Sequence, residues 1–331
     1  MMRYCFRLLL LVCAFSTVKF SYARPSDTIP PAAHAEGYTI NTFHSMFADD
    51  VDLLNLRNHG HNWYLEDFYN EPPARASQLK IDSQEGITIS SGNRKELATA
   101  TRYFSKKLGK NARDDHKWVG TAFGGGGYFE ADIKFDPDIV FKQQKSEGWP
   151  AFWAMSIEHR AGLESEKWEQ GGEGFVRFME IDAMEYLYKD AGKKNQYGAN
   201  IHHWYGVYRK TCPKGAFCHM SVPYRDRSVD VPKGTSFNNF HRYGFLWVPA
   251  TDQKNGYIQF YFDGEPVNKR VEWSKYDESL PIEDEDLRSF ALLDTQHIIL
   301  LLGSGNDMPM TVRSVSVWQN SDDNNWVTRP E

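Results

Sequence analysis

The sequence predicts an all-β fold, an antiparallel β-sandwich or barrel in a single domain. Short runs in which apolar and polar residues alternate recur along the chain, separated by Gly, Pro, Asn and Asp. The sequence shows no heptads, no internal repeat and no long helical pattern, and short helical pieces are expected only in places such as 283–293. All-β domains of this size commonly form one unit.

Seven segments show the clearest strand pattern. They are 86–90, 127–137, 175–187, 241–249, 256–267, 296–303 and 310–319.

Glycines mark two positions in this pattern. Asp263-Gly264 separates two alternating runs, which is typical of a two-residue hairpin turn. Four glycines at 124–127 allow another segment of backbone to approach closely at the start of a strand. A phosphate-binding loop is excluded there, because neither a Lys-Ser/Thr pair nor a helix start follows the glycines.

The N-terminus has the pattern of a secretory signal peptide over residues 1–23. Arg3 and Arg7 precede the apolar run 8–15, and the segment ends in the small-x-small sequence 21–23. The apolar run is too short to span a bilayer, and no later run approaches the roughly 20 apolar residues of a membrane helix. We therefore expect a secreted or periplasmic protein without membrane association after signal removal.

The remaining chain divides into two parts. Residues 24–37 are rich in Pro and Ala and predict a flexible leader. Residues 38–325 form the predicted β-domain, which we expect to be a monomer.

The charge balance and aromatic content indicate a neutral partner. Without the three basic residues of the signal, the 38 basic and 44 acidic residues leave a formal charge of −9. This excess argues against nucleic acid and strongly anionic polymers as partners. Ten Trp and seventeen Tyr provide flat amphipathic rings of the kind that stack on sugars, although a β-rich core accounts for many of them. We expect a polysaccharide substrate.

Two cysteines, Cys212 and Cys218, remain after signal removal, and they flank a Pro/Gly turn. In an oxidising compartment this spacing favours a short-loop disulfide, which would stabilise the fold by about 2 kcal/mol. Free thiols are the alternative. A zinc site is less favoured, because no further ligands lie at zinc spacing nearby.

Three carboxylates, Glu180, Asp182 and Glu185, stand in an otherwise apolar run. Transfer of a carboxylate from water into apolar surroundings costs free energy, so these residues are expected either at a solvated edge or in a functional site. In a regular strand Glu180 and Asp182 share one face, and Glu185 points to the other. A β-bulge at Ala183-Met184 would return Glu185 to the face of the other two, and such bulges are frequent beside active sites.

Carboxylates gathered on one face are suited to glycoside hydrolysis. The retaining reaction needs two carboxyl groups about 5–5.5 Å apart, one as nucleophile and one as general acid and then base. A third carboxylate between them would raise the pKa of the acid and orient the nucleophile. The spacing by itself leaves two alternatives open, a calcium-binding acidic cluster and a solvated acidic strand.

Segment 180–185 fits the E-x-D-x-x-E signature of glycoside hydrolase family 16, and resembles the bulged version found in laminarinase- and agarase-like members. Segments 127–137, 148–155, 240–267 and 310–319 also resemble segments of this family and occur in the same order. The resemblance implies a concanavalin A-like jelly roll, in which two antiparallel sheets stack.

By this resemblance, Glu180 is the nucleophile, Asp182 the assisting carboxylate and Glu185 the general acid/base. Trp149 and Trp153 match a W-P-A-x-W segment and are expected to bind substrate, with packing as the alternative for Trp149.

A neighbouring strand over 199–206 is expected to direct His202 and Trp204 toward the substrate. These two residues share a face by alternation, while His203 should point the other way into packing.

Other features depart from the family pattern. Arg313 stands where an Asp is common in the closing strand, so that the sequence does not support a structural calcium ion and we expect no cofactor. Segment 158–174 is long, and 301–310 lacks a tryptophan-containing loop, which weakens any substrate assignment by analogy.

The sequence therefore predicts a secreted retaining endo-glycosidase. A β-1,3-glucan or mixed β-1,3/1,4-glucan is favoured as substrate over an agar-type galactan. A non-catalytic lectin-like jelly roll and a transglycosylase with the same residues are the alternatives. A polysaccharide lyase is less favoured, because no Arg/Gln/His/Tyr set at lyase spacing is found.

Overall fold

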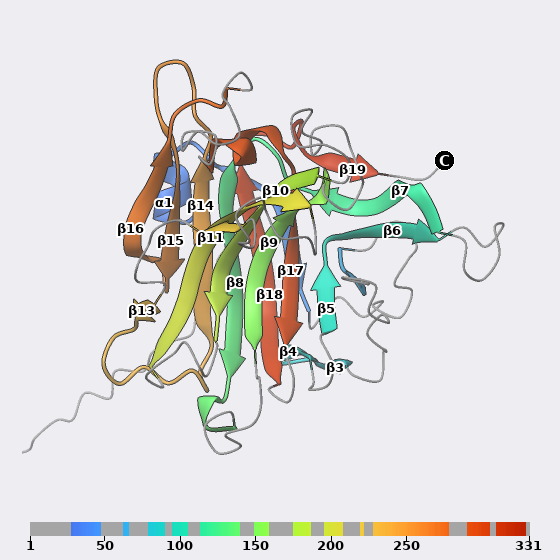
Figure 1. Cartoon of the computed structure of the whole chain (residues 1–331). Coiled ribbons are helices and arrows are strands. Elements are labelled where there is room, and N and C mark those ends of the chain that lie inside the picture. The colour runs from blue at the N-terminus through green and yellow to red at the C-terminus, as the bar shows by residue number, and fades with distance from the viewer. Residues whose placement is uncertain are drawn as a thin grey trace, which may run out of the picture.

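The computed structural model describes residues 28–47, 62–65, 79–89, 95–104, 113–139, 149–158, 175–186, 195–207, 219–221, 228–277, 290–304 and 309–328. Two large antiparallel sheets stack face to face, and a small third sheet lies to one side of them (Figure 1). The antiparallel β-sandwich expected from the alternating sequence pattern is confirmed.

The first sheet has the order β16 (Glu265–Trp273), β15 (Gly256–Phe262), β14 (His241–Val248), β8 (Gly127–Phe135), β18 (Met310–Gln319), β4 (Gly86–Ile89) and β3 (Leu79–Asp82), with β1 (Ile40–Met46) also paired to β18. The second sheet has the order β12 (His219–Ser221), β11 (Gln196–Val207), β10 (Phe175–Glu185), β9 (Pro150–Ser156), β17 (Ile298–Ser304), β5 (Lys95–Ala98) and β2 (Tyr64–Leu65), with β13 (Ser228–Asp230) beside β11. The third sheet consists of β19 (Trp326–Thr328), β7 (Arg113–Ala122) and β6 (Ala100–Phe104).

Strands near the C-terminus complete both large sheets. Strand β17 lies between β9 and β5 in the second sheet, and β18 lies between β8 and β4 in the first. The chain therefore returns to each layer after a long excursion, as it does in a jelly roll. Neither sheet is continuous until these late strands have paired.

The core between the sheets is built from alternate residues of their strands. Phe129 and Phe245 of the first sheet stack with ring centroids 4.6 Å apart. Met179 and Ile181 of β10 are fully buried in the same cluster from the opposite layer. A buried side chain of this size stabilises the fold by roughly 1.5–3 kcal/mol, so that this alternation holds each strand in one register.

The hairpin between β15 and β16 turns at the predicted pair. Asp263 and Gly264 have φ of 51° and 85°, the positive values that a type I′ turn requires at both central positions. The Asp263 carboxylate also accepts a hydrogen bond from the Arg242 backbone N–H at 2.9 Å, which joins the turn to β14. The hairpin prediction is confirmed.

The four-glycine segment permits the close approach expected of it. Gly126 has a φ of +87°, and a Cβ atom there would collide with the Tyr38 hydroxyl and lie 2.8 Å from the Trp247 carbonyl oxygen. Only glycine fits both the backbone conformation and the space.

The structure differs from the expected flexible leader at its end. Residues Pro31–Ala35 form a short helix, α1, within the segment 24–37. Ala33 is fully buried against the outer side of the first sheet, and Tyr38 donates a hydrogen bond to the Trp247 carbonyl oxygen at 3.0 Å. Apolar contacts that are remote in sequence order these residues, and composition could not reveal such contacts.

Other predictions fall on residues that the structure leaves undescribed. The predicted signal peptide, residues 1–23, and the pair Cys212 and Cys218 lie outside the described residues. Within the described ranges, no helix combines the length and the apolar character needed to cross a bilayer.

A half-buried carboxylate is predicted to hold the short 3₁₀-helix η7 (Phe290–Thr295) against the first sheet. Asp294 accepts hydrogen bonds from the indole N–H groups of Trp247 and Trp273 at 2.9 and 2.8 Å, and from the Ala250 backbone N–H at 2.8 Å. Asp294→Ala leaves these donors without their acceptor, and we expect it to lower the free energy of unfolding by roughly 3 kcal/mol in urea denaturation.

Asp252→Ala is the matched control for this measurement. Asp252 pairs with Lys275 on the exposed surface, and its loss should change the free energy of unfolding by less than about 0.5 kcal/mol. Equal effects of the two substitutions would contradict the structural role of Asp294.

Candidate active site

Strand β10 separates an apolar face from an acidic one. Met179 and Ile181 point into the core between the sheets, and Glu180 and Asp182 point to the outer face of the second sheet. Neighbouring strands fix the positions of both carboxylates. Glu180 pairs with Met155 of β9, and Asp182 pairs with Trp153.

A β-bulge returns Glu185 to the outer face. Asp182 and Glu185, three residues apart on β10, face Trp153 and Ala151, which are two residues apart on β9. The register against β11 shifts in the same interval. The extra residue lies at Ala183-Met184, where both side chains are fully buried in the core. The bulge predicted from the sequence is confirmed, and it places all three carboxylates on one face.

The surroundings of the carboxylates are largely apolar. Besides the acidic residues, the outer face of the second sheet carries a buried cluster of small and large hydrophobic side chains. Its members include Ala98, Met155, Phe178, Ile299 and Leu301, with Trp153 and Trp204 packed against them. Such surroundings strengthen electrostatic interactions among the carboxylates, because little water screens them.

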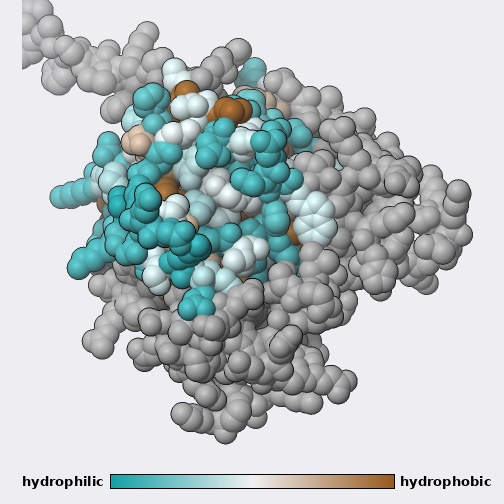
Figure 2. All heavy atoms as spheres, turned by 90° about the horizontal axis from the view of Figure 1, so that it is seen from above, coloured by the Kyte–Doolittle hydropathy of each residue, from teal (hydrophilic) through white to brown (hydrophobic). Residues whose placement is uncertain are grey.

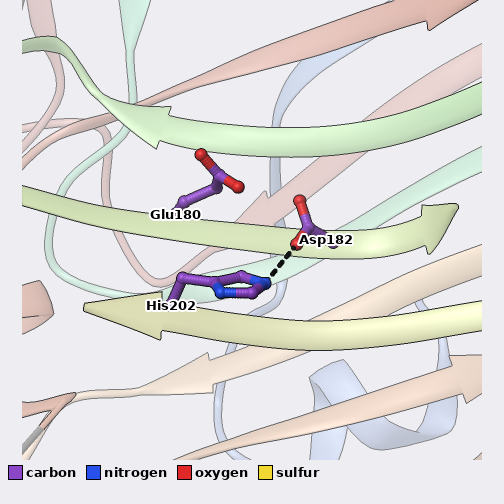
Figure 3. Close-up of side chains that lie close together, drawn as sticks. All are labelled: Glu180, Asp182 and His202. Atoms are coloured by element: carbon purple, nitrogen blue, oxygen red, sulfur yellow. Dashed lines mark ion pairs between the residues drawn. The ribbon is translucent and has the colours of Figure 1, made fainter. Parts of the chain in front are cut away.

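His202 on β11 is the direct partner of Asp182. Its Nε2 lies 3.0 Å from Asp182 Oδ2, and the exposed fractions of His202 and Asp182 are 6% and 2% (Figure 3). Asn200, two residues earlier on the same face, places its Nδ2 3.2 Å from the same imidazole nitrogen. Sequence reasoning did not identify Asn200, although its spacing from His202 was the available signal.

Burial and neighbouring charges shift the pKa of Glu180. Burial raises the pKa of Glu180 well above its ordinary value, and the negative charges of Asp182 and Glu185 raise it further. A positive charge on His202 and a hydrogen bond from the Trp204 side chain act in the opposite direction. Part of the Glu180 side chain nevertheless remains accessible to solvent, as a group that meets a substrate must be.

Trp149 contacts the third carboxylate. Its indole Nε1 donates a hydrogen bond to Glu185 Oε1 at 2.8 Å, immediately before β9 begins. The Trp149 side chain is 37% exposed, and it is one of two large hydrophobic residues exposed in the described part of the chain, with Ile40. On the face seen in Figure 2, most of the coloured residues are hydrophilic or near neutral, with a few hydrophobic ones among them.

Aromatic side chains continue the site on β11. Trp204 stacks on Phe178 at a centroid distance of 6.1 Å and on the His202 ring at 5.9 Å. His203 pairs with Met179, whose side chain points into the core, and is 4% exposed, as the alternation predicted. The structure thus brings together all the candidates proposed from the sequence on β9, β10 and β11.

Arg313, which replaces an expected acidic residue, lies on the first sheet. Its Nη1 donates to Asp132 Oδ2 at 2.9 Å, and its guanidinium lies 3.7 Å from the centroid of the Phe240 ring. Burial raises the pKa of Asp132 to about 6, and the charge of Arg313 opposes this rise.

Comparisons with known proteins found similarity in structure. No protein-family model and no curated protein matches the chain. An endo-1,3-β-glucanase from Streptomyces sioyaensis is 13% identical with a TM-score of 0.46, and the match covers 88% of this chain and 97% of that one. β-Agarase A from Zobellia galactanivorans is 15% identical with a TM-score of 0.40, over 74% and 76% of the two chains.

A third similar structure comes from work on endo-acting O-glycanases that members of the human gut microbiota express to initiate mucin breakdown. It is 12% identical with a TM-score of 0.45, and the match covers 85% of this chain and 100% of that chain. At these identities and TM-scores, the activity of the present chain has to be inferred from its own residues.

The charge of His202 is predicted to control the ionisation of Glu180. His202→Gln keeps a polar side chain but removes the positive charge that lowers the Glu180 pKa. We expect the pKa of Glu180 to rise in the variant, so that less Glu180 is ionised at any given pH. Titration of ¹³C-labelled glutamate carboxyl groups by NMR measures this directly.

His297→Gln serves as the control for this titration. His297 also contacts a carboxylate, with its Nδ1 2.6 Å from Glu158 Oε1, but it is not among the groups that shift Glu180. An unchanged Glu180 pKa in the His202 variant would show that the His202 charge has no influence there.

Proposed function

We propose that this protein is a secreted glycoside hydrolase that cleaves internal β-linkages of a neutral polysaccharide with retention of anomeric configuration. One observation carries the proposal: the bulge at Ala183-Met184 places Glu180, Asp182 and Glu185 on one face of β10. The motif resemblance assigns the same three residues to this chemistry.

Glu180 acts as the nucleophile. Its carboxylate attacks the anomeric carbon, the bond to the leaving-group oxygen breaks, and Glu185 gives that oxygen a proton. A covalent glycosyl-enzyme results. Glu185, now a carboxylate, then takes a proton from water, whose oxygen attacks the anomeric carbon and releases Glu180.

The neighbouring charges fit this division of roles. Three carboxyl groups so close together cannot all ionise readily, because each negative charge raises the pKa of the others. A proton that remains on Glu185 supplies the acid and removes one of the charges that raise the Glu180 pKa. Asp182, held by His202 at 3.0 Å, lies between the two glutamates in the strand and keeps its orientation through both steps.

The surroundings favour a neutral sugar chain as substrate. Trp149 and Trp153 offer aromatic surface beside Glu185 and Asp182, and sugar rings present apolar C–H faces that pack on such rings. The net charge of the mature chain disfavours an anionic polymer. We infer a β-1,3-glucan or a mixed β-1,3/1,4-glucan, ahead of an agar-type galactan, and the signal-like N-terminus supports export.

Glu180→Ser is predicted to abolish hydrolysis while it leaves glycan binding in place. Loss of the nucleophile should reduce kcat by roughly 10³-fold or more, because the covalent intermediate no longer forms. Release of reducing ends from laminarin, lichenan and agarose measures the activity, and affinity electrophoresis on the same glycans measures binding.

Glu272→Ser, an exposed glutamate on β16 of the first sheet, is the control and should hydrolyse normally. Undiminished hydrolysis by the Glu180 variant would refute the assignment of the nucleophile. Glycan binding without hydrolysis by the unmodified protein would favour the lectin-like alternative. NMR of the first product decides between retention and inversion, and analysis of longer products reveals transfer to sugars.

Trp149→Phe tests the hydrogen bond to Glu185. Phenylalanine keeps an aromatic ring for the sugar but lacks the N–H that holds Glu185 Oε1 at 2.8 Å. We expect kcat to fall about tenfold, the effect of losing roughly 1.4 kcal/mol of positioning, with KM nearly unchanged. Trp149→Ala should raise KM as well. An unaltered kcat in the Phe variant would leave Trp149 with a stacking role alone.

A further inference from the structure

Glu180, Asp182 and His202 form a group of side chains with the chemistry of a metal site. Each offers one ligand atom, and these three atoms all lie within 4.8 Å of one another. We propose that this group binds a divalent transition-metal ion, such as Zn²⁺, when no glycan is present. Metal binding stands on the geometry alone, and its inhibitory consequence rests on the proposed function.

Two adjacent strands hold the three ligands in place. Glu180 and Asp182 project from β10, and His202 projects from β11 directly opposite Glu180 (Figure 3). Backbone pairing therefore fixes the relative positions of the three α-carbons before any ion arrives. Preorganisation of this kind lowers the conformational cost of assembling a site.

The contact between His202 Nε2 and Asp182 Oδ2 offers a position for a proton or for a metal ion. Asn200 Oδ1 accepts the Ile201 backbone N–H at 3.0 Å, so that its amide Nδ2, a donor, is the group facing His202 Nε2 at 3.2 Å. The single lone pair of His202 Nε2 can accept the Asn200 N–H, carry a proton or bind a metal ion, but only one of these at a time. A proton on Nε2 is donated to Asp182 Oδ2 at 3.0 Å, and a metal ion bound between the two atoms would replace this proton.

A proton or a metal ion can fill this position, because the distance suits a hydrogen-bonded ion pair and also suits two ligand atoms of one metal ion. Ligand bonds of about 2.1 Å place neighbouring ligand atoms about 3.0 Å apart at a 90° angle and about 3.4 Å apart at the tetrahedral angle. The separation of His202 Nε2 from Asp182 Oδ2 is 3.0 Å. Small side-chain adjustments, with Glu180 closing from its partly exposed position, complete a three-ligand site.

The ligand set selects the class of ion. One imidazole nitrogen with two carboxylate oxygens suits Zn²⁺, Mn²⁺ or Co²⁺, whereas Ca²⁺ and Mg²⁺ take oxygen ligands almost exclusively. Asp182 and His202 are nearly inaccessible, while Glu180 keeps solvent access. The partly exposed side supplies an entry path and room for a water ligand.

The consequence for hydrolysis is inhibition. An ion bound through Glu180 holds the electron pairs of the nucleophile, which then cannot attack the anomeric carbon. Zn²⁺ and glycan should therefore compete, and a chelator should restore hydrolysis without loss of fold.

Calorimetric titration with Zn²⁺ alone tests the binding on the full mature chain. We expect one Zn²⁺ site in the unmodified protein. Loss of a residue that only hydrogen-bonds to a metal ligand lowers metal affinity roughly 10–100-fold, so that His202→Ala, which removes a ligand itself, should lower the Zn²⁺ affinity at least that much. His297→Ala is the matched control, because His297, just before β17, contacts the Glu158 carboxylate, just after β9, with Nδ1 and Oε1 2.6 Å apart, and neither residue belongs to the proposed site. It should bind Zn²⁺ as the unmodified chain does.

A second variant and a Co²⁺ absorption spectrum test the same site in case His202→Ala does not fold. Glu180→Gln preserves volume and should weaken Zn²⁺ binding comparably, and visible absorption of the Co²⁺ form should report a nitrogen-oxygen ligand set that His202→Ala or Glu180→Gln changes. Unweakened Zn²⁺ binding by the folded variants, or its loss in His297→Ala, would overturn the proposal.

Hydrolysis assays separate this proposal from the proposed function. If the protein cleaves a glycan, we measure the Zn²⁺ concentration that halves the rate of hydrolysis and extrapolate it to low substrate concentration. This concentration should match the calorimetric Kd for Zn²⁺. A difference of more than about tenfold would mean that the inhibitory ion binds elsewhere. If no glycan is cleaved, the glycosidase assignment fails, and the titration of the variants still decides the metal site.

Discussion

One inserted residue in β10 is the constraint on which the site depends. A regular strand would direct Glu185 into the layer where Met179 and Ile181 pack, which would bury a charge in the core. The bulge at Ala183-Met184 takes up the extra residue, buries both of those side chains, and turns Glu185 outward. The apolar core and the acidic face are therefore products of the same irregularity.

The two-layer architecture gives this strand its rigidity. Strand β10 lies between β9 and β11, away from the edges of the second sheet, and its inner residues are locked against the first sheet. The site consequently rests on paired strands instead of loops, and its α-carbons have little freedom. The late insertion of β17 beside β9 means that the support for this face is complete only when the C-terminal part of the chain has folded.

The contact between His202 and Asp182 places a group that can carry a positive charge beside the carboxylates of the site. Three carboxylates in apolar surroundings repel one another, and burial adds to the cost of ionising Glu180. A cation at His202 offsets part of that cost. The same contact can hold either a proton or a metal ion, because each can lie between His202 Nε2 and Asp182 Oδ2.

The sequence by itself determined several central strands of the two large sheets, the hairpin at Asp263-Gly264, the acidic motif and the need for a bulge, because alternation and turn chemistry are local. Tertiary structure alone decided which side chains meet: Asn200 with His202, Trp149 with Glu185, and α1 with the first sheet. These contacts join residues through strand pairing and side-chain rotamers. Both depend on the complete sandwich, and neither leaves a local pattern in the sequence.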